Sequence, residues 1–169
     1  HSVAYDFGPA FGLFSPAKDS IDGSFRQHEK DAFDVAVVSH RAADHSGGLA
    51  SVGSRLQGSK IFSGQPLING DRRCVFPMRW HFDGVEFRFL NPPNIQFNED
   101  NNKSCVLHIK GKFGAALFTG DLERPAEFAL SDFYGQELRA DVIQIPHHGS
   151  HSSSSTLFLS KVDPKLGIL

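Results

Sequence analysis

The sequence lacks an apolar run long enough to cross a lipid bilayer, and it shows no signal peptide. It also lacks a large net charge: the value of −2 excludes a strongly basic nucleic-acid-binding module. The composition of 40% hydrophobic and 21% charged residues is that of a folded domain and excludes a disordered chain. With sixteen phenylalanines and 169 residues, the chain can bury a core without cross-links, and we expect one domain over residues 1–169.

Strand and helix patterns alternate along the chain. Compact β-branched or apolar runs predict three strands, at 33–38, 60–62 and 142–145. Alternating runs predict two hairpins, at 79–90 and 104–118. Helical spacing or an early proline predicts three helices, which begin near 46, 123 and 155. Glycine and proline predict a long loop over 7–31. This alternation favours a mixed α/β fold.

Nine histidines are many for this length, and several of them stand with aspartates directly after predicted strands. Three strand ends carry such groups, namely His40, Asp44 and His45, then Asp121, then His147 and His148. A single histidine or aspartate at a strand end is usually a turn or cap residue. Three groups together favour a metal site, because zinc and manganese bind imidazole and carboxylate ligands.

Five short segments resemble a known family. Residues 39–49 (SHRAADHSGGL) resemble the H-x-H-x-D-H motif of metallo-β-lactamase-fold hydrolases, while 119–121 (TGD) and 5–9 (YDFGP) resemble their bridging and early aspartates. Residues 101–107 (NNKSCVL) and 146–154 (PHHGSHSSS) are similar to segments of ComEC-type DNA-internalisation proteins of natural competence. The ordered set is more specific than any one segment.

The resemblance implies an αββα metallo-β-lactamase-like sandwich, excised from a larger membrane protein. It implies a metal-dependent phosphodiesterase that degrades the DNA strand not transported during transformation. The implied partners are DNA, the rest of the membrane-embedded chain and other competence proteins. The parent protein would lie in the cytoplasmic membrane, with this domain on the extracytoplasmic side.

The resemblance also implies the ligands of the metal. One zinc or manganese site would use Asp44, His45, Asp121 and His147, where His147 is favoured over His148 because it is nearer the strand end. Asp44 and His148 are the catalytic candidates, His148 through contact with the substrate. A second site would use His40, position 42 and Asp121. Ala42 cannot bind a metal, so we expect one well-occupied site.

Further residues are expected to support this site. Asp6 would orient the His40 loop by hydrogen bonds. Gly47 and Gly48 would allow a close backbone approach to phosphate at a helix start, or would form a plain helix cap. We expect three hydroxyl groups to point toward the ligands or the substrate, those of Ser104, Ser150 and Ser152.

The two cysteines are predicted to form a disulfide. Cys74 precedes the first hairpin and Cys105 lies in the next strand, so the two could be neighbours in the sheet. The resemblance places the domain outside the cytoplasm, where disulfides persist. By contrast, His108 alternates away from the apolar residues of its strand, which predicts a solvated side chain.

Two other functions stay open. Ala42 would suit a degenerate domain that binds DNA or assembles a channel without hydrolysis. A small-molecule hydrolase such as a lactonase is the third reading, because a fold does not fix its substrate.

Overall fold

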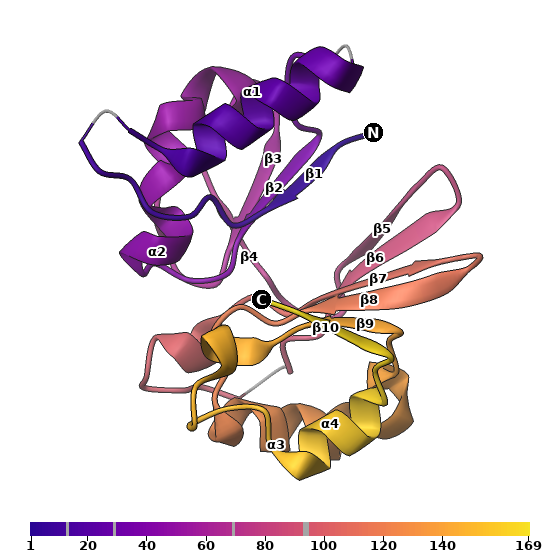
Figure 1. Ribbon diagram of the computed structural model, residues 1–169. Coiled ribbons are helices and arrows are strands. Elements are labelled where there is room, and N and C mark those ends of the chain that lie inside the picture. Colours follow the sequence, from indigo (N-terminus) through magenta and orange to yellow (C-terminus); the bar gives the residue numbers. More distant parts are fainter. Residues whose placement is uncertain (13, 29, 69, 93–94) are drawn as a thin grey trace. The chain divides into compact units, whose positions relative to one another are not determined.

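The computed structural model describes residues 1–12, 14–28, 30–68, 70–92 and 95–169. The chain divides into two compact units, His1–Arg73 and Cys74–Leu169. Each unit contains a β-sheet with helices packed against it (Figure 1). The two sheets flanked by helices confirm the mixed α/β fold. The single domain over 1–169 stays a prediction.

The first unit is built on a four-stranded parallel sheet with the order β1-β2-β3-β4. Its strands are β1 (Val3–Tyr5), β2 (Val35–Val38), β3 (Lys60–Ser63) and β4 (Arg72–Arg73). Its helices are α1 (Pro16–His28), α2 (Ala43–Ser46) and the 3-10 helix η1 (Gly47–Leu56).

Burial of β2 organises the first unit. All four residues of this strand are buried, as expected for a β-branched run between two parallel neighbours. The core joins Ala36 and Val38 of β2 to Phe25 of α1 and to Leu49 and Val52 of η1. The loop predicted over 7–31 is therefore wrong in its second half, where α1 forms and buries Phe25.

The second unit is built on a six-stranded mixed sheet with the order β10-β9-β8-β7-β6-β5. Its strands are β5 (Arg79–Phe82), β6 (Val85–Phe89), β7 (Leu107–Gly111), β8 (Gly114–Phe118), β9 (Val142–Gln144) and β10 (Leu166–Ile168). Its α-helices are α3 (Arg124–Tyr134) and α4 (Thr156–Val162). Its 3-10 helices are η2 (Asn101–Lys103), η3 (Gly135–Leu138) and η4 (Pro146–Gly149).

Helices α3 and α4 cover one face of this sheet (Figure 1). Leu117 of β8 and Ile143 of β9 share a buried cluster with Leu130 of α3 and Phe158 of α4. His108 pairs with Leu117 across β7 and β8, so both side chains lie on the helix-covered face. The solvated position predicted for His108 is wrong, since this residue is only 2% exposed.

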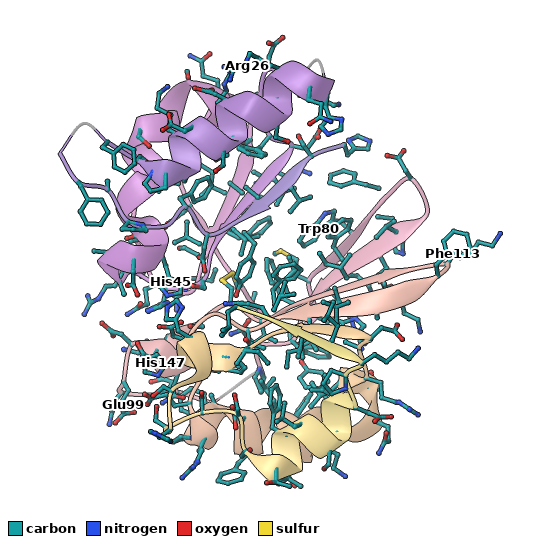
Figure 2. All side chains as sticks on the ribbon, in the orientation of Figure 1. Arg26, His45, Trp80, Glu99, Phe113 and His147 are labelled. Atoms are coloured by element: carbon teal, nitrogen blue, oxygen red, sulfur yellow. A yellow bond between two sulfur atoms is a disulfide. The ribbon has the colours of Figure 1, made fainter. Side chains whose placement is uncertain are left out.

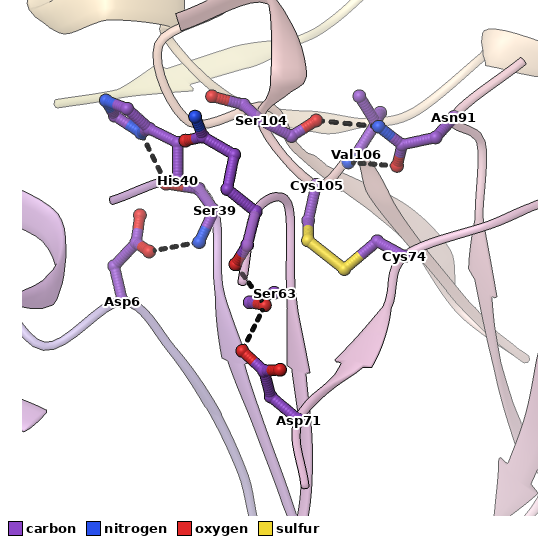
Figure 3. Close-up of a disulfide and its surroundings, with 11 residues drawn as sticks. Asp6, Ser39, His40, Ser63, Asp71, Cys74, Asn91, Ser104, Cys105 and Val106 are labelled. Carbon is purple, nitrogen blue, oxygen red and sulfur yellow. Dashed lines mark hydrogen bonds between the residues drawn. A yellow bond between two sulfur atoms is a disulfide. The ribbon is translucent and has the colours of Figure 1, made fainter. Parts of the chain in front are cut away.

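The predicted disulfide between Cys74 and Cys105 is confirmed (Figure 3). The two Cα atoms are 5.5 Å apart, and the bond closes a loop between residues 31 positions apart in the sequence. Both cysteines are buried. Close to it, the Asn91 side chain donates to the Ser104 carbonyl and accepts from the Val106 amide, which fixes the segment around Cys105. Within the described ranges, no helix has the length and apolar character that crossing a membrane requires.

Candidate metal centre

In the first unit, candidate ligands follow the carboxyl ends of two parallel strands. Because β1 and β2 are neighbours, their ends bring Asp6 and Ser39 to the same edge of the sheet. Asp6 adopts a left-handed conformation with φ of 60°. One oxygen of its carboxylate accepts the Ser39 amide at 2.6 Å, and the other accepts Nδ1–H of His45 at 2.8 Å. Asp6 thus joins the strand ends to the following helix.

The Asp6 contact orients the His45 ring. With Nδ1 bonded to a carboxylate, Nε2 is the ring nitrogen left for a metal, which is the usual arrangement of metal-binding histidines. Nε2 lies 3.6 Å from Oδ2 of Asp44, a separation that lets both atoms bind one ion. His40 is fully buried beside it, with Nδ1 hydrogen-bonded to the Ser39 hydroxyl at 3.1 Å.

Ala42 and the two glycines have structural roles in the first unit. Ala42 is the N-cap residue of α2 and makes no side-chain cap. The Gly47 amide donates to the Ala43 carbonyl, and the Gly48 amide donates to the Gly8 carbonyl. A Cβ atom on Gly47 would lie 2.9 Å from the backbone nitrogen of Ala10. Both amides are used inside the protein, so the structure supports close packing rather than phosphate binding for this pair.

In the second unit, Asp121 is held by a turn whose amides are capped. The side chain of Gln144 accepts the amides of Thr119 at 3.1 Å and Gly120 at 2.9 Å. The Asp121 amide donates to the Ser104 hydroxyl at 3.1 Å. Asp121 itself is 3% exposed. The predicted residue Ser104 therefore positions the backbone of the predicted ligand.

The two histidines of η4 both direct Nε2 toward Asp121. The distances to its carboxylate oxygens are 3.6 Å from His148 and 3.9 Å from His147. Both histidines adopt left-handed backbone conformations, with φ of 49° at His147 and 51° at His148. This conformation is uncommon for any residue other than glycine, and it aims two consecutive side chains at one carboxylate.

Glu123 is a site residue that sequence reasoning missed. Its Oε1 atom lies 3.2 Å from Nδ1 of His147 and accepts the Ser152 hydroxyl at 3.0 Å. Asn101 donates to Nε2 of His147 at 3.5 Å. An acidic partner often orients a histidine, but the position of Glu123 two residues after Asp121 does not by itself indicate a contact with His147.

The serines after His148 are engaged within the second unit. The Ser150 and Ser152 hydroxyls lie 3.1 Å apart, and Ser152 also contacts Nδ1 of His147 at 3.2 Å. The buried carboxylate of Glu127 accepts the amide of Ser155 at 2.8 Å and so anchors the end of the loop. The loop that carries His147 is therefore held at several points.

Comparison with known proteins gives relatives but no match to a protein-family model. The chain is 38% identical over 158 residues to competence protein ComA of Neisseria gonorrhoeae, which covers 93% of the chain and 23% of that protein. It is 30% identical over 176 residues to recombination protein 2 of Haemophilus influenzae, which covers 99% of the chain and 21% of that protein. The chain thus spans between a fifth and a quarter of the length of these relatives.

Among solved structures, the metallo-β-lactamase-fold protein YhfI of Bacillus subtilis is similar, with a TM-score of 0.54 and 12% identity. The alignment covers 98% of the chain and 73% of YhfI. At this identity the similarity concerns the fold alone.

Proposed function

Because the chain is a homologue of the competence proteins and has the metallo-β-lactamase fold, we propose that it is a metal-dependent phosphodiesterase acting on DNA. Competence is the uptake of DNA, so a hydrolase within a competence protein would meet the phosphodiester bonds of the incoming DNA. The strand that is not taken up is the proposed substrate. The other proposed partners are the remainder of a longer membrane protein and further competence components.

The observation that carries the proposal is a pair of donors in each unit. Asp44 and His45 place a carboxylate oxygen and a ring nitrogen 3.6 Å apart, and Asp121 and His148 do the same at 3.6 Å. Carboxylate with imidazole is a donor set that zinc and manganese accept. We propose that each pair supplies ligands for a divalent metal, and the resemblance is the reason to assign Asp44, His45 and Asp121 to the same metal.

We assign the ligand role to His148 and substrate contact to His147, the reverse of the assignment that the resemblance implied. In the second unit, Nδ1 of His147 faces Glu123, and its Nε2 accepts a hydrogen bond from Asn101. Both ring nitrogens of His147 are therefore engaged by protein groups. In this arrangement His147 would touch a substrate through its ring beside Asp121, and not through a free N–H group.

A bound divalent metal supplies Lewis-acid chemistry that lowers the pKa of water and offsets charge on a phosphodiester. The chain's own contribution is orientation. Asp6 holds His45 in one tautomer, and Ser104 fixes the backbone of Asp121. Ala42 offers no ligand beside His40, which supports a single metal.

The absence of a ligand at Ala42 also favours a second candidate, a domain that binds DNA without cleaving it. Reactions that displace a phosphate ester commonly use two metals. A chain with one complete donor set would therefore be better suited to binding DNA than to cleaving it.

Metal analysis joined to cleavage assays tests the proposal. Purified protein should contain about one zinc or manganese per chain and cleave single- or double-stranded DNA, but not a lactone. Asp121→Asn should lose both metal and cleavage, while Asp132→Asn, at an exposed position on α3, should keep both. Metal binding without cleavage would favour the non-hydrolytic domain, and lactone cleavage alone would overturn DNA as substrate.

A further inference from the structure

A groove lies in the second unit at the amino-terminal end of β8, away from Asp121. It has a volume of about 620 Å³ and is lined by residues 110–115, 139–141 and 162–165. Strand β8 runs from this groove to the turn that carries Asp121. At about 3.3 Å per residue, the two places are roughly 20 Å apart along the strand.

The groove carries an excess of positive charge. Four cations line it, and two of them are paired: Arg139 with Asp163 at 2.5 Å, and Lys165 with Asp141 at 2.7 Å. The hydrogen bond from Lys165, followed by that from the Ala115 amide, lowers the pKa of Asp141, so this carboxylate stays charged.

The remaining two cations are Lys110 and Lys112 of the β7–β8 hairpin. Within the described part of the chain, neither lysine has an ion pair, and both are exposed. Two positive charges are thus available to a ligand, on a chain whose net charge is −2.

Phe113 follows Lys112 directly, at the tip of the hairpin. Its side chain is 94% exposed, and Figure 2 shows it projecting from the end of the hairpin. The ammonium group of Lys112 lies 5.3 Å from the centre of the ring. A ring that is almost wholly in water and lies beside a lysine ammonium group contributes nothing to the core, which points to a role in binding.

We propose that this groove binds single-stranded nucleic acid, with a base stacked on Phe113 and phosphates contacted by Lys110 and Lys112. Stacking rings alternating with cations in a groove are the usual features of sequence-tolerant single-strand sites. Asp141 and Asp163 are neutralised by their ion pairs, and a hollow suits a narrow polyanion better than a flat anionic membrane. The choice of nucleic acid rests in part on the proposed function, while the groove itself does not depend on the metal.

Fluorescence anisotropy with a labelled twenty-nucleotide oligothymidylate tests the proposal. The full chain is used in EDTA, so that binding is measured without the metal site. Phe113→Ser should weaken binding about fivefold or more through loss of a stacked base. The double variant Lys110→Gln/Lys112→Gln should reduce the slope of log affinity against log salt by about 1.4, the value for two lost phosphate contacts.

Matched variants control for charge and for an exposed ring. Lys30→Gln/Lys60→Gln removes two exposed lysines of the first unit, and Phe128→Ser removes an exposed ring of α3. Both should bind like the parent protein. Unchanged affinity in the groove variants would overturn the proposal. So would binding to vesicles with anionic lipid, weakened by the same substitutions, in the absence of oligothymidylate binding. If the parent protein binds oligothymidylate in EDTA but does not cleave DNA when metal is supplied, the result contradicts the proposed function and not the proposed groove.

Discussion

At position 42, a methyl group stands where the resemblance expects a metal ligand. Ala42 has φ of −60° and ψ of 146°, the extended conformation of an N-cap residue, and it is partly exposed. An aspartate fits this backbone without strain and would also cap α2. A single substitution can therefore test whether the second metal site is missing only this side chain.

We expect Ala42→Asp to raise the metal content toward two ions per chain and to increase the rate of DNA cleavage about tenfold or more. The gain would come from a second carboxylate near His40. Ala42→Asn is the matched control, because asparagine caps a helix as well as aspartate but is a poorer ligand. Equal metal content in the two variants, measured by elemental analysis, would contradict the assignment of position 42.

The candidate site could be predicted in outline, because three groups of histidine and aspartate follow predicted strands and the resemblance supplies the ligand set. Glu123 and His108 could not. Glu123 is identified only by its distance to His147, which the sequence does not contain. His108 alternates as a solvated residue should, but its face of β7 is covered, and its Nε2 hydrogen-bonds with the Arg139 carbonyl at 3.0 Å.

At the scale of elements, the disulfide supports the segment that positions Asp121. Cys105 follows Ser104, whose hydroxyl accepts the Asp121 amide. The bond therefore ties the beginning of the second unit to a residue of the proposed metal site.

We expect Cys74→Ala/Cys105→Ala to lower the free energy of unfolding by about 3–4 kcal/mol, the chain-entropy value for a loop of this length. Metal affinity should fall as well, because the support of Asp121 loosens. Urea denaturation of both proteins, with and without reductant, measures the effect. Reductant should destabilise the parent protein and leave the double variant unchanged. Two reactive thiols in the unreduced parent protein would refute the bond.

Helix α1 shows why one element was missed. Ala17, Ile21 and Phe25 recur every four residues and all contribute to the core, which is the spacing of one helical face. Pro16 and Gly23 obscured this pattern. Pro16 begins the helix, where its missing N–H is not needed, and Gly23 is tolerated on the partly exposed side. Packing of this apolar face against the core therefore stabilises a helix in a segment whose glycine and proline content suggests a loop.

At the scale of the whole molecule, stability should depend on pH through His108. Burial lowers the pKa of His108, and the hydrogen bond to the Arg139 carbonyl opposes this effect only in part. Nearby Arg88 and Lys110 also lower the pKa, while Glu86 raises it. Its Nδ1 atom has no hydrogen-bond partner within the described residues, so a proton there would be unpaired. The unfolded chain binds this proton more readily, and stability is lost as the pH falls below about 6.5.

The measurement is the free energy of unfolding in urea at pH 7.5 and 5.5, in EDTA. His108→Gln should show a smaller loss over this interval than the parent protein, by at most about 1.4 kcal/mol per pH unit for one proton. His81→Gln removes an exposed histidine and serves as the control. Parallel pH profiles for the parent and His108→Gln would exclude this residue as the source.

The left-handed backbone at His147 and His148 determines which substitutions would stabilise the chain at these two positions. Glycine or asparagine would adopt these conformations at lower cost, so each histidine is kept against a local penalty of about 1 kcal/mol or more. A lineage that no longer used the two rings would gain stability by drifting to glycine or asparagine there, whereas drift at Ala42 meets no such bias. The two histidines thus stand where the backbone alone would favour glycine or asparagine, whereas Ala42 stands where the backbone has no such preference. This contrast is what the proposed role of the two rings requires.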